Sequence, residues 1–61
     1  IDAPYGREIW LDDVTFESGM RLLRLTIKEG RRFTQLDLDA ATAERCGRSM
    51  LDWADGKDPS A

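Results

Sequence analysis

Three stretches of the chain alternate apolar and polar residues with a period of two, and this pattern predicts three β-strands. They cover residues 7–16, 20–28 and 31–38. Alternation of this kind places successive side chains on opposite faces of a sheet. Short breaks containing glycine separate the stretches, at residues 17–19 and at Glu29-Gly30, and both are suited to tight turns. Residues 7–38 are therefore predicted to form an antiparallel β-meander.

The apolar residues of the first predicted strand change phase halfway along it. Ile9 and Leu11 share one phase, whereas Val14 and Phe16 share the other. A strand cannot turn from one face to the other without an inserted residue. The pattern therefore predicts a β-bulge at the acidic pair, residues 12–13, which would direct all four apolar side chains to the core.

The second predicted turn sets the register of the hairpin around it. A two-residue loop at Glu29-Gly30 makes Lys28 and Arg31 the closing pair. One face then pairs Ile27 with Arg32, Leu25 with Thr34, and Leu23 with Leu36. The opposite face pairs Thr26 with Phe33, Arg24 with Gln35, and Leu22 with Asp37.

Residues 39–55 show a helical period and predict one amphipathic helix with Asp39 as its N-cap. Gly47 lies on its apolar side, where it costs up to about 1 kcal/mol of helix propensity, and a close approach of helix to sheet would explain it. Gly56 is expected to cap the C-terminus, and residues 57–61 to form a polar tail. The apolar helix arc contains Ala40, Ala43, Cys46, Gly47, Met50, Leu51, Trp53 and Ala54.

These elements predict one small α+β domain over residues 1–61, a three-stranded antiparallel β-meander packed against one C-terminal amphipathic α-helix (β-β-β-α). Residues 1–6 contain Pro4 and Gly6 and are expected to be an irregular lead-in, from which Tyr5 could fold back on the body.

Residue types exclude several kinds of chemistry. With one cysteine, Cys46, no internal disulfide can form, and without histidine neither a zinc site nor a Ser-His or Cys-His pair is expected. Cys46 is expected to be a buried, inert thiol. The Asp12-Asp13 pair has no further ligands near it in sequence, so a metal is disfavoured. We expect no enzyme activity, no cofactor and no metal.

Charge is distributed unevenly along the chain, whose net charge is −3. Between residues 20 and 36, five basic residues stand against Glu29 alone, a local charge of +4, which leaves −7 for the remainder. A solvated hairpin explains this cluster, and a docking surface for an acidic partner or a phosphate is the alternative. No apolar run is long enough to cross a membrane, and we expect a cytoplasmic protein.

If the helix covers the aliphatic side of the sheet, the other side carries an unusually apolar set of residues. Faces left to solvent are normally polar, and exposed apolar patches mark contact sites. We expect this face to bind protein, either a second copy or a larger assembly. Single-stranded nucleic acid is the alternative, disfavoured by the acidic total, and cover by residues 1–6 or by a tail is the third hypothesis. The residues are Trp10, Leu22, Arg24, Thr26, Phe33 and Gln35.

Two resemblances follow from these stretches. The run ESGMRLLRLTIKEGRRFTQLDL, followed by a helix that ends in LDWAD, resembles short uncharacterised bacterial proteins, a family of unknown function. Strands followed by one C-terminal helix are similar in layout to PC4-like transcriptional coactivators, which are dimers that bind single-stranded DNA across a four-stranded sheet. This resemblance implies a transcription-associated role, but the lysine-rich binding strands of that family have no counterpart here.

Overall fold

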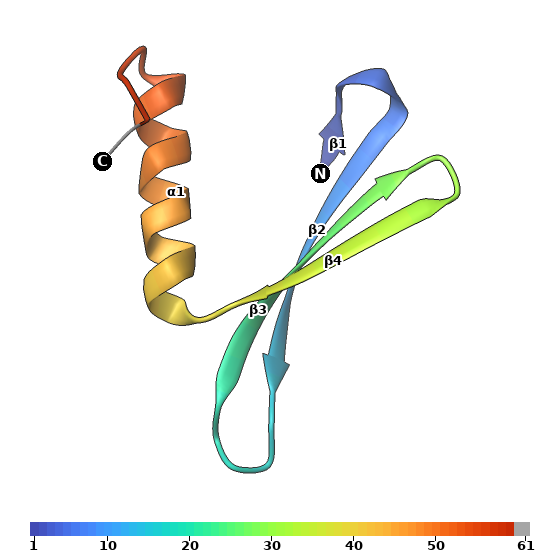
Figure 1. Ribbon diagram of the computed structural model, residues 1–61, viewed down its shortest axis with the longest axis vertical. Helices are drawn as coiled ribbons and strands as arrows, with labels where there is room; N and C mark the ends of the chain where they lie inside the picture. The colour runs from blue at the N-terminus through green and yellow to red at the C-terminus, as the bar shows by residue number, and fades with distance from the viewer. Residues whose placement is uncertain (60–61) are drawn as a thin grey trace.

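The computed structural model describes residues 1–59 and shows an α+β chain with an antiparallel sheet and one C-terminal helix, as the sequence predicts. Over these residues the sheet has four strands rather than three, in the order β1-β2-β3-β4 (Figure 1). The helix follows the last strand in sequence. The elements are β1 (Asp2–Ala3), β2 (Arg7–Thr15), β3 (Arg21–Glu29), β4 (Arg32–Leu38) and α1 (Ala40–Ala54).

The irregular lead-in predicted for residues 1–6 is wrong, because its first residues pair with β2. The Ile1 ammonium donates to the Ile9 carbonyl at 2.8 Å, and the Ile9 N–H donates back to the Ile1 carbonyl at 2.8 Å. A single 3₁₀ turn, Pro4–Gly6, reverses the chain between β1 and β2. Tyr5 is almost fully exposed at a positive φ of 65°, so it does not fold back on the body. A two-residue strand is too short to show any periodicity.

The predicted bulge at residues 12–13 is also wrong, because β2 pairs with β3 without interruption from Arg7 to Thr15. Val14 therefore lies opposite Leu22, on the other face from Ile9. Asp13 takes the place on the aliphatic side instead. Its carboxylate accepts from Thr15 Oγ1 at 3.1 Å and from Arg21 Nε at 3.5 Å. An acidic residue is tolerated there because its partners lie on the same face at the end of the strand.

The hairpin between β3 and β4 is displaced by two residues from the predicted register. Glu29 pairs with Arg32, so the loop residues are Gly30 and Arg31. Gly30 has a φ of 60°, which is the conformation that a type II′ turn requires at its first central residue. A shift of two keeps every side chain on its predicted face, because the strand period is two. The partners change: Ile27 faces Thr34, Leu25 faces Leu36, and Leu23 faces Leu38.

Both ends of α1 are capped as the sequence predicts. Asp39 is the N-cap, and its Oδ1 accepts from the Thr42 N–H at 3.0 Å. At the other end Gly56 has a φ of 87° and donates to the Trp53 carbonyl at 2.9 Å. The Lys57 N–H donates to the Asp52 carbonyl at 2.8 Å, which completes a Schellman motif.

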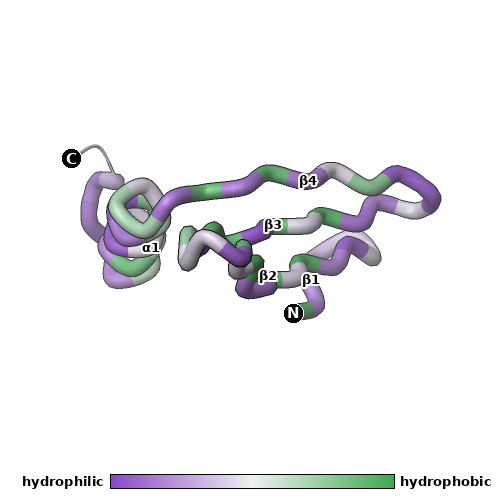
Figure 2. Tube along the Cα trace, turned by 90° about the horizontal axis from the view of Figure 1, so that it is seen from below, coloured by the Kyte–Doolittle hydropathy of each residue, from purple (hydrophilic) through white to green (hydrophobic). Residues whose placement is uncertain are grey.

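The predicted packing of the helix over the aliphatic side of the sheet is wrong. Only Asp39 connects β4 to α1, and the helix and the strands diverge from this junction (Figure 1). The hydropathy-coloured trace shows the helix beside the strands, at one end of the sheet (Figure 2). The main contact of α1 is with β3, at the junction lined by Leu23, Leu38, Ala40 and Ala43. The helix begins one residue after β4 and extends away from the strands instead of back over the sheet.

The consequence is that residues 1–59 form no fully buried hydrophobic core. Among residues 1–59 no apolar side chain is buried, and the one buried residue is Thr26. The radius of gyration is 13.5 Å, against about 10.5 Å for a compact domain of this length. The accessible surface is 5350 Å², which exceeds by roughly 1,300 Å² the surface of about 4,000 Å² expected for a folded monomer of this mass.

Candidate protein-interaction surfaces

The six residues predicted to form a contact surface do share one side of the sheet, which we call the aromatic face. They occupy even positions on β2 and β3 and odd positions on β4, and the observed register places these positions on the same side. Trp10, Thr26 and Gln35 form one row across the three strands. The full set is Trp10, Leu22, Arg24, Thr26, Phe33 and Gln35.

Two aromatic rings meet across the central strand on this face. Trp10 lies on β2 and Phe33 on β4, and their ring centroids are 5.9 Å apart with planes tilted by 43°. Thr26 lies between these strands on β3 and is only 3% exposed. It therefore cannot contact a partner directly, whatever the sequence pattern indicated. The rings remain accessible, with 40% of Trp10 and 55% of Phe33 exposed.

Arg24 is held by a carboxylate on the neighbouring strand. Its Nε donates to Asp37 Oδ1 at 2.9 Å and its second terminal nitrogen donates to Oδ2 at 3.1 Å, a bidentate pair. These hydrogen bonds raise the pKa of Arg24 above its usual value and lower the pKa of the Asp37 carboxyl. The guanidinium is thereby fixed in orientation, and its charge is matched within the sheet.

Electrostatics of the aromatic face weigh against an anionic ligand. Its rows hold three carboxylates, of Glu8, Asp12 and Asp37, against two basic side chains. Those two are Arg24, which pairs with Asp37, and Lys28, whose Nζ lies 6.0 Å from the centroid of the Phe33 ring. On the aromatic face the basic side chains are thus outnumbered by carboxylates, which favours the solvated interpretation of the hairpin over a phosphate-binding one at this face.

The opposite side of the sheet, which we call the aliphatic face, is the surface that sequence reasoning assigned to the core. It remains open because the helix does not cover it. Leu11 and Leu36 flank Leu25 in the middle row and are 52% and 53% exposed. An Arg7–Glu29 pair at 2.8 Å borders one end, and an Arg21–Asp13 pair at 3.5 Å borders the other. The apolar set is Ile9, Leu11, Leu23, Leu25, Ile27, Leu36 and Leu38.

The apolar helix arc is equally uncovered. Met50, Leu51 and Trp53 are each about two-thirds exposed. A Cβ added at Gly47 would meet no atom within 4 Å, so the close approach expected at this glycine is absent within the chain. In the sequence, the one sign that the helix would not cover the sheet was the single residue, Asp39, between the last strand and the helix.

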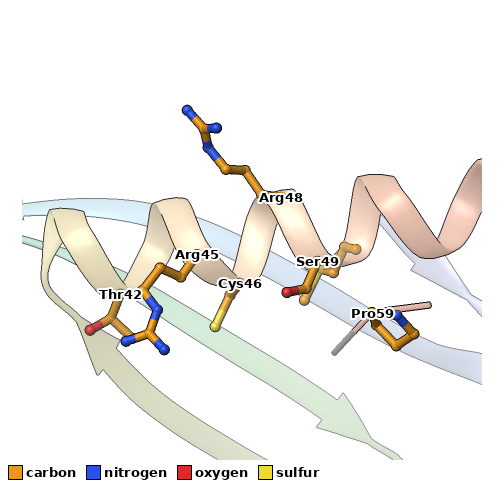
Figure 3. Close-up of a pocket in the computed structure, with 7 residues that line it drawn as sticks. Thr42, Arg45, Cys46, Arg48, Ser49 and Pro59 are labelled. Atoms are coloured by element: carbon orange, nitrogen blue, oxygen red, sulfur yellow. The ribbon is translucent and has the colours of Figure 1, made fainter. Parts of the chain in front are cut away.

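Cys46 is exposed, which contradicts the buried thiol predicted from its position on the arc. It lines an open hollow along the helix, where its Sγ points to the same side as the Arg45 side chain, while Arg48 points away (Figure 3). Arg48 instead pairs with Glu44 at 2.9 Å. The thiol is exposed because no sheet lies against this part of the helix.

The remaining features bear on metals and membranes. Asp12 and Asp13 are consecutive in β2, so they project from opposite faces and cannot bind one ion together. Over residues 1–59, no three carboxylate or thiol side chains cluster as metal ligands would. The described helix is neither long nor apolar enough to cross a membrane.

Comparison with known proteins gives one match. Residues 1–56 match the model of a family of unknown function (DUF6967). Neither the curated proteins nor the solved structures contain a match. The resemblance to a family of unknown function is confirmed, whereas the bacterial origin stays a prediction and the PC4-like layout gains no support.

Proposed function

This chain belongs to a family of unknown function (DUF6967), and we propose that it is a non-catalytic protein-interaction module. One observation carries the proposal: among residues 1–59 no apolar side chain is buried. Small domains without disulfides or metals need such burial to fold, and association is the route that remains. The chain is a homodimer or a small subunit of a larger assembly.

The aromatic face is the surface that this module offers to another protein. Trp10 and Phe33 supply exposed rings in fixed contact, and Arg24 supplies a guanidinium that is already oriented. Aromatic and arginine side chains are enriched among the residues that dominate interface energies, and a guanidinium that is already held in place loses less rotamer freedom on binding. The exposed thiol of Cys46 fits a reducing compartment, so the proposal places the module in the cytoplasm.

A photo-cross-linking residue in place of Phe33 tests the proposal in cells that produce the protein. The control carries the same residue in place of Ser18, in the exposed turn between β2 and β3. We expect protein adducts from position 33 and few from position 18. Equal yields from the two positions, or no adduct from position 33, would overturn the proposal. Adducts removed by nuclease would support single-stranded nucleic acid instead.

A further inference from the structure

The chain holds two complementary halves of a two-layer domain that do not meet each other. A sheet with one apolar face is normally covered by a helix, and an amphipathic helix normally covers a sheet. Here the aliphatic face has no helix over Leu11 and Leu36, and the apolar helix arc has no sheet under Met50 and Leu51. Each half is the partner that the other lacks.

The connection between the halves prevents the chain from closing on itself. β4 ends at Leu38 and α1 begins at Ala40, with Asp39 alone between them. Asp39 is committed as the N-cap, because its carboxylate accepts from the Thr42 N–H. Unwinding the first turn to lengthen this connection would remove that hydrogen bond. The helix therefore extends away from its own sheet, with its main contact on β3 at the junction near Ala40 and Ala43.

We propose that two copies of this chain form a dimer in which the helix of each copy lies on the aliphatic face of the other. The contact is isologous, so the two-fold symmetry of the dimer covers the aliphatic face and the apolar helix arc of both copies. No part of the proposal uses the aromatic face, which stays on the outside of the dimer. The inference therefore goes beyond the proposed function and names a second surface and its occupant.

Exposed area supports a second copy as the occupant. Each chain exposes 5350 Å², roughly 1,300 Å² more than a compact monomer of its mass. Obligate dimers bury on the order of 1,000 to 2,500 Å² per partner. The excess surface thus matches what each copy would bury. The two ion pairs that border the aliphatic face, Arg7–Glu29 and Arg21–Asp13, supply the polar rim that surrounds an apolar interface centre.

Folding and association are coupled in such a dimer. Without a partner, no apolar side chain of residues 1–59 is fully buried, and those in the centre of the sheet are only half-buried, so the separated chain has little to offset its conformational entropy. Light scattering on the purified chain is expected to give the mass of two 6.9-kDa chains. The thermal midpoint should rise with protein concentration. A monomer with a concentration-independent midpoint would overturn the proposal.

Cross-linking through the single native cysteine tests the arrangement itself. A tagged Cys46→Ser chain carrying Leu36→Cys is mixed and refolded with the unmodified chain, then treated with a short bis-maleimide. The expected product contains one chain of each kind, because the helix thiol of one lies near the sheet thiol of the other. The matched control carries Gln35→Cys, one residue away on the aromatic face, and should give at least tenfold less product.

Other cross-linking outcomes overturn the helix exchange. A chain with both Cys46 and Leu36→Cys that cross-links within itself would show that the helix closes on its own sheet. Stronger cross-linking from Gln35→Cys, or a dimer without cross-linking from Leu36→Cys, would show a different interface. A monomeric chain that still gives Phe33 adducts in cells would reject the exchange and leave the proposed function standing. A dimer without such adducts would do the reverse.

Discussion

Leu36→Ala is the substitution whose effect depends most on whether a second chain covers the aliphatic face. Within one chain, 53% of Leu36 is exposed. Full burial of a leucine side chain contributes about 1.5 to 3 kcal/mol, so the part that remains to be buried is worth about 0.8 to 1.6 kcal/mol. A symmetric dimer contains this residue twice. Truncation should therefore cost the dimer about 1.6 to 3.2 kcal/mol, or roughly 10- to 200-fold in its dissociation constant.

Urea unfolding followed by circular dichroism at several protein concentrations measures this loss, fitted as folded dimer to two unfolded chains. The matched control is Gln35→Ala, the neighbouring residue of β4 that points to the aromatic face. As a surface substitution it should change the free energy of unfolding by no more than about 0.5 kcal/mol. The reasoning is refuted if the two variants lose equal stability, or if the midpoint of Leu36→Ala does not depend on concentration.

Four further outcomes are expected. In single-tryptophan variants at high concentration, Trp53 should be quenched by acrylamide less than Trp10, which reverses their exposures of 68% and 40% within one chain; stronger quenching of Trp53 would contradict helix burial. Gly47→Ala should favour the helix of the dissociated chain by about 0.8 to 1 kcal/mol, because its methyl group meets open space within the chain; helical circular dichroism at high dilution should therefore increase, and an unchanged or weaker signal would contradict this. Hydrogen bonds from Thr42 lower the pKa of the Asp39 carboxyl below 3.8. The ionised carboxylate therefore stabilises the helix fully above that pH, and this stabilisation is lost as the pH falls through the lower folded-state pKa. Asp39→Asn should then lose less helix than the unmodified chain between pH 4 and pH 2 by circular dichroism, and identical acid titrations would contradict this. Single-stranded oligonucleotides should not be retarded at low salt, since carboxylates outnumber basic groups on the aromatic face; retardation that weakens steeply with salt would favour nucleic acid.

The errors in the predicted strands arise because contacts between strands are not visible in the pattern of a single strand. The sequence pattern placed a bulge between Leu11 and Val14 to keep the apolar residues on one face. In the structure β2 stays regular, so Asp13 occupies the aliphatic face near the end of the strand, where an apolar residue was expected. Such an exchange is possible because Arg21 and Thr15 satisfy the carboxylate, and a partner on another strand cannot be read from one strand's pattern. The displaced hairpin kept its faces, because a shift of two residues preserves the period.

The candidate surface was predicted in part. All six residues of the aromatic face lie together, because alternation alone determines which residues share a side of a strand. The burial of Thr26 and the pairing of Arg24 were not predicted. Both depend on which residues β4 places beside β3, Asp37 among them. The aliphatic face was expected to be core, yet Leu11 and Leu36 on it are about half exposed.

The sequence by itself determined most local features of this protein: the three long strands, the glycines at which the chain turns between them, the helix and its caps, and the residues that share each face of β3 and β4. Each depends on interactions within a few residues, such as the Asp39 cap or the positive φ at Gly30. Only the tertiary structure decided that the helix does not cover its own sheet. Amphipathic patterns state that a face must be buried but not against which chain. The one-residue link at Asp39 excludes this chain's own sheet, and that leaves the apolar surfaces for a partner.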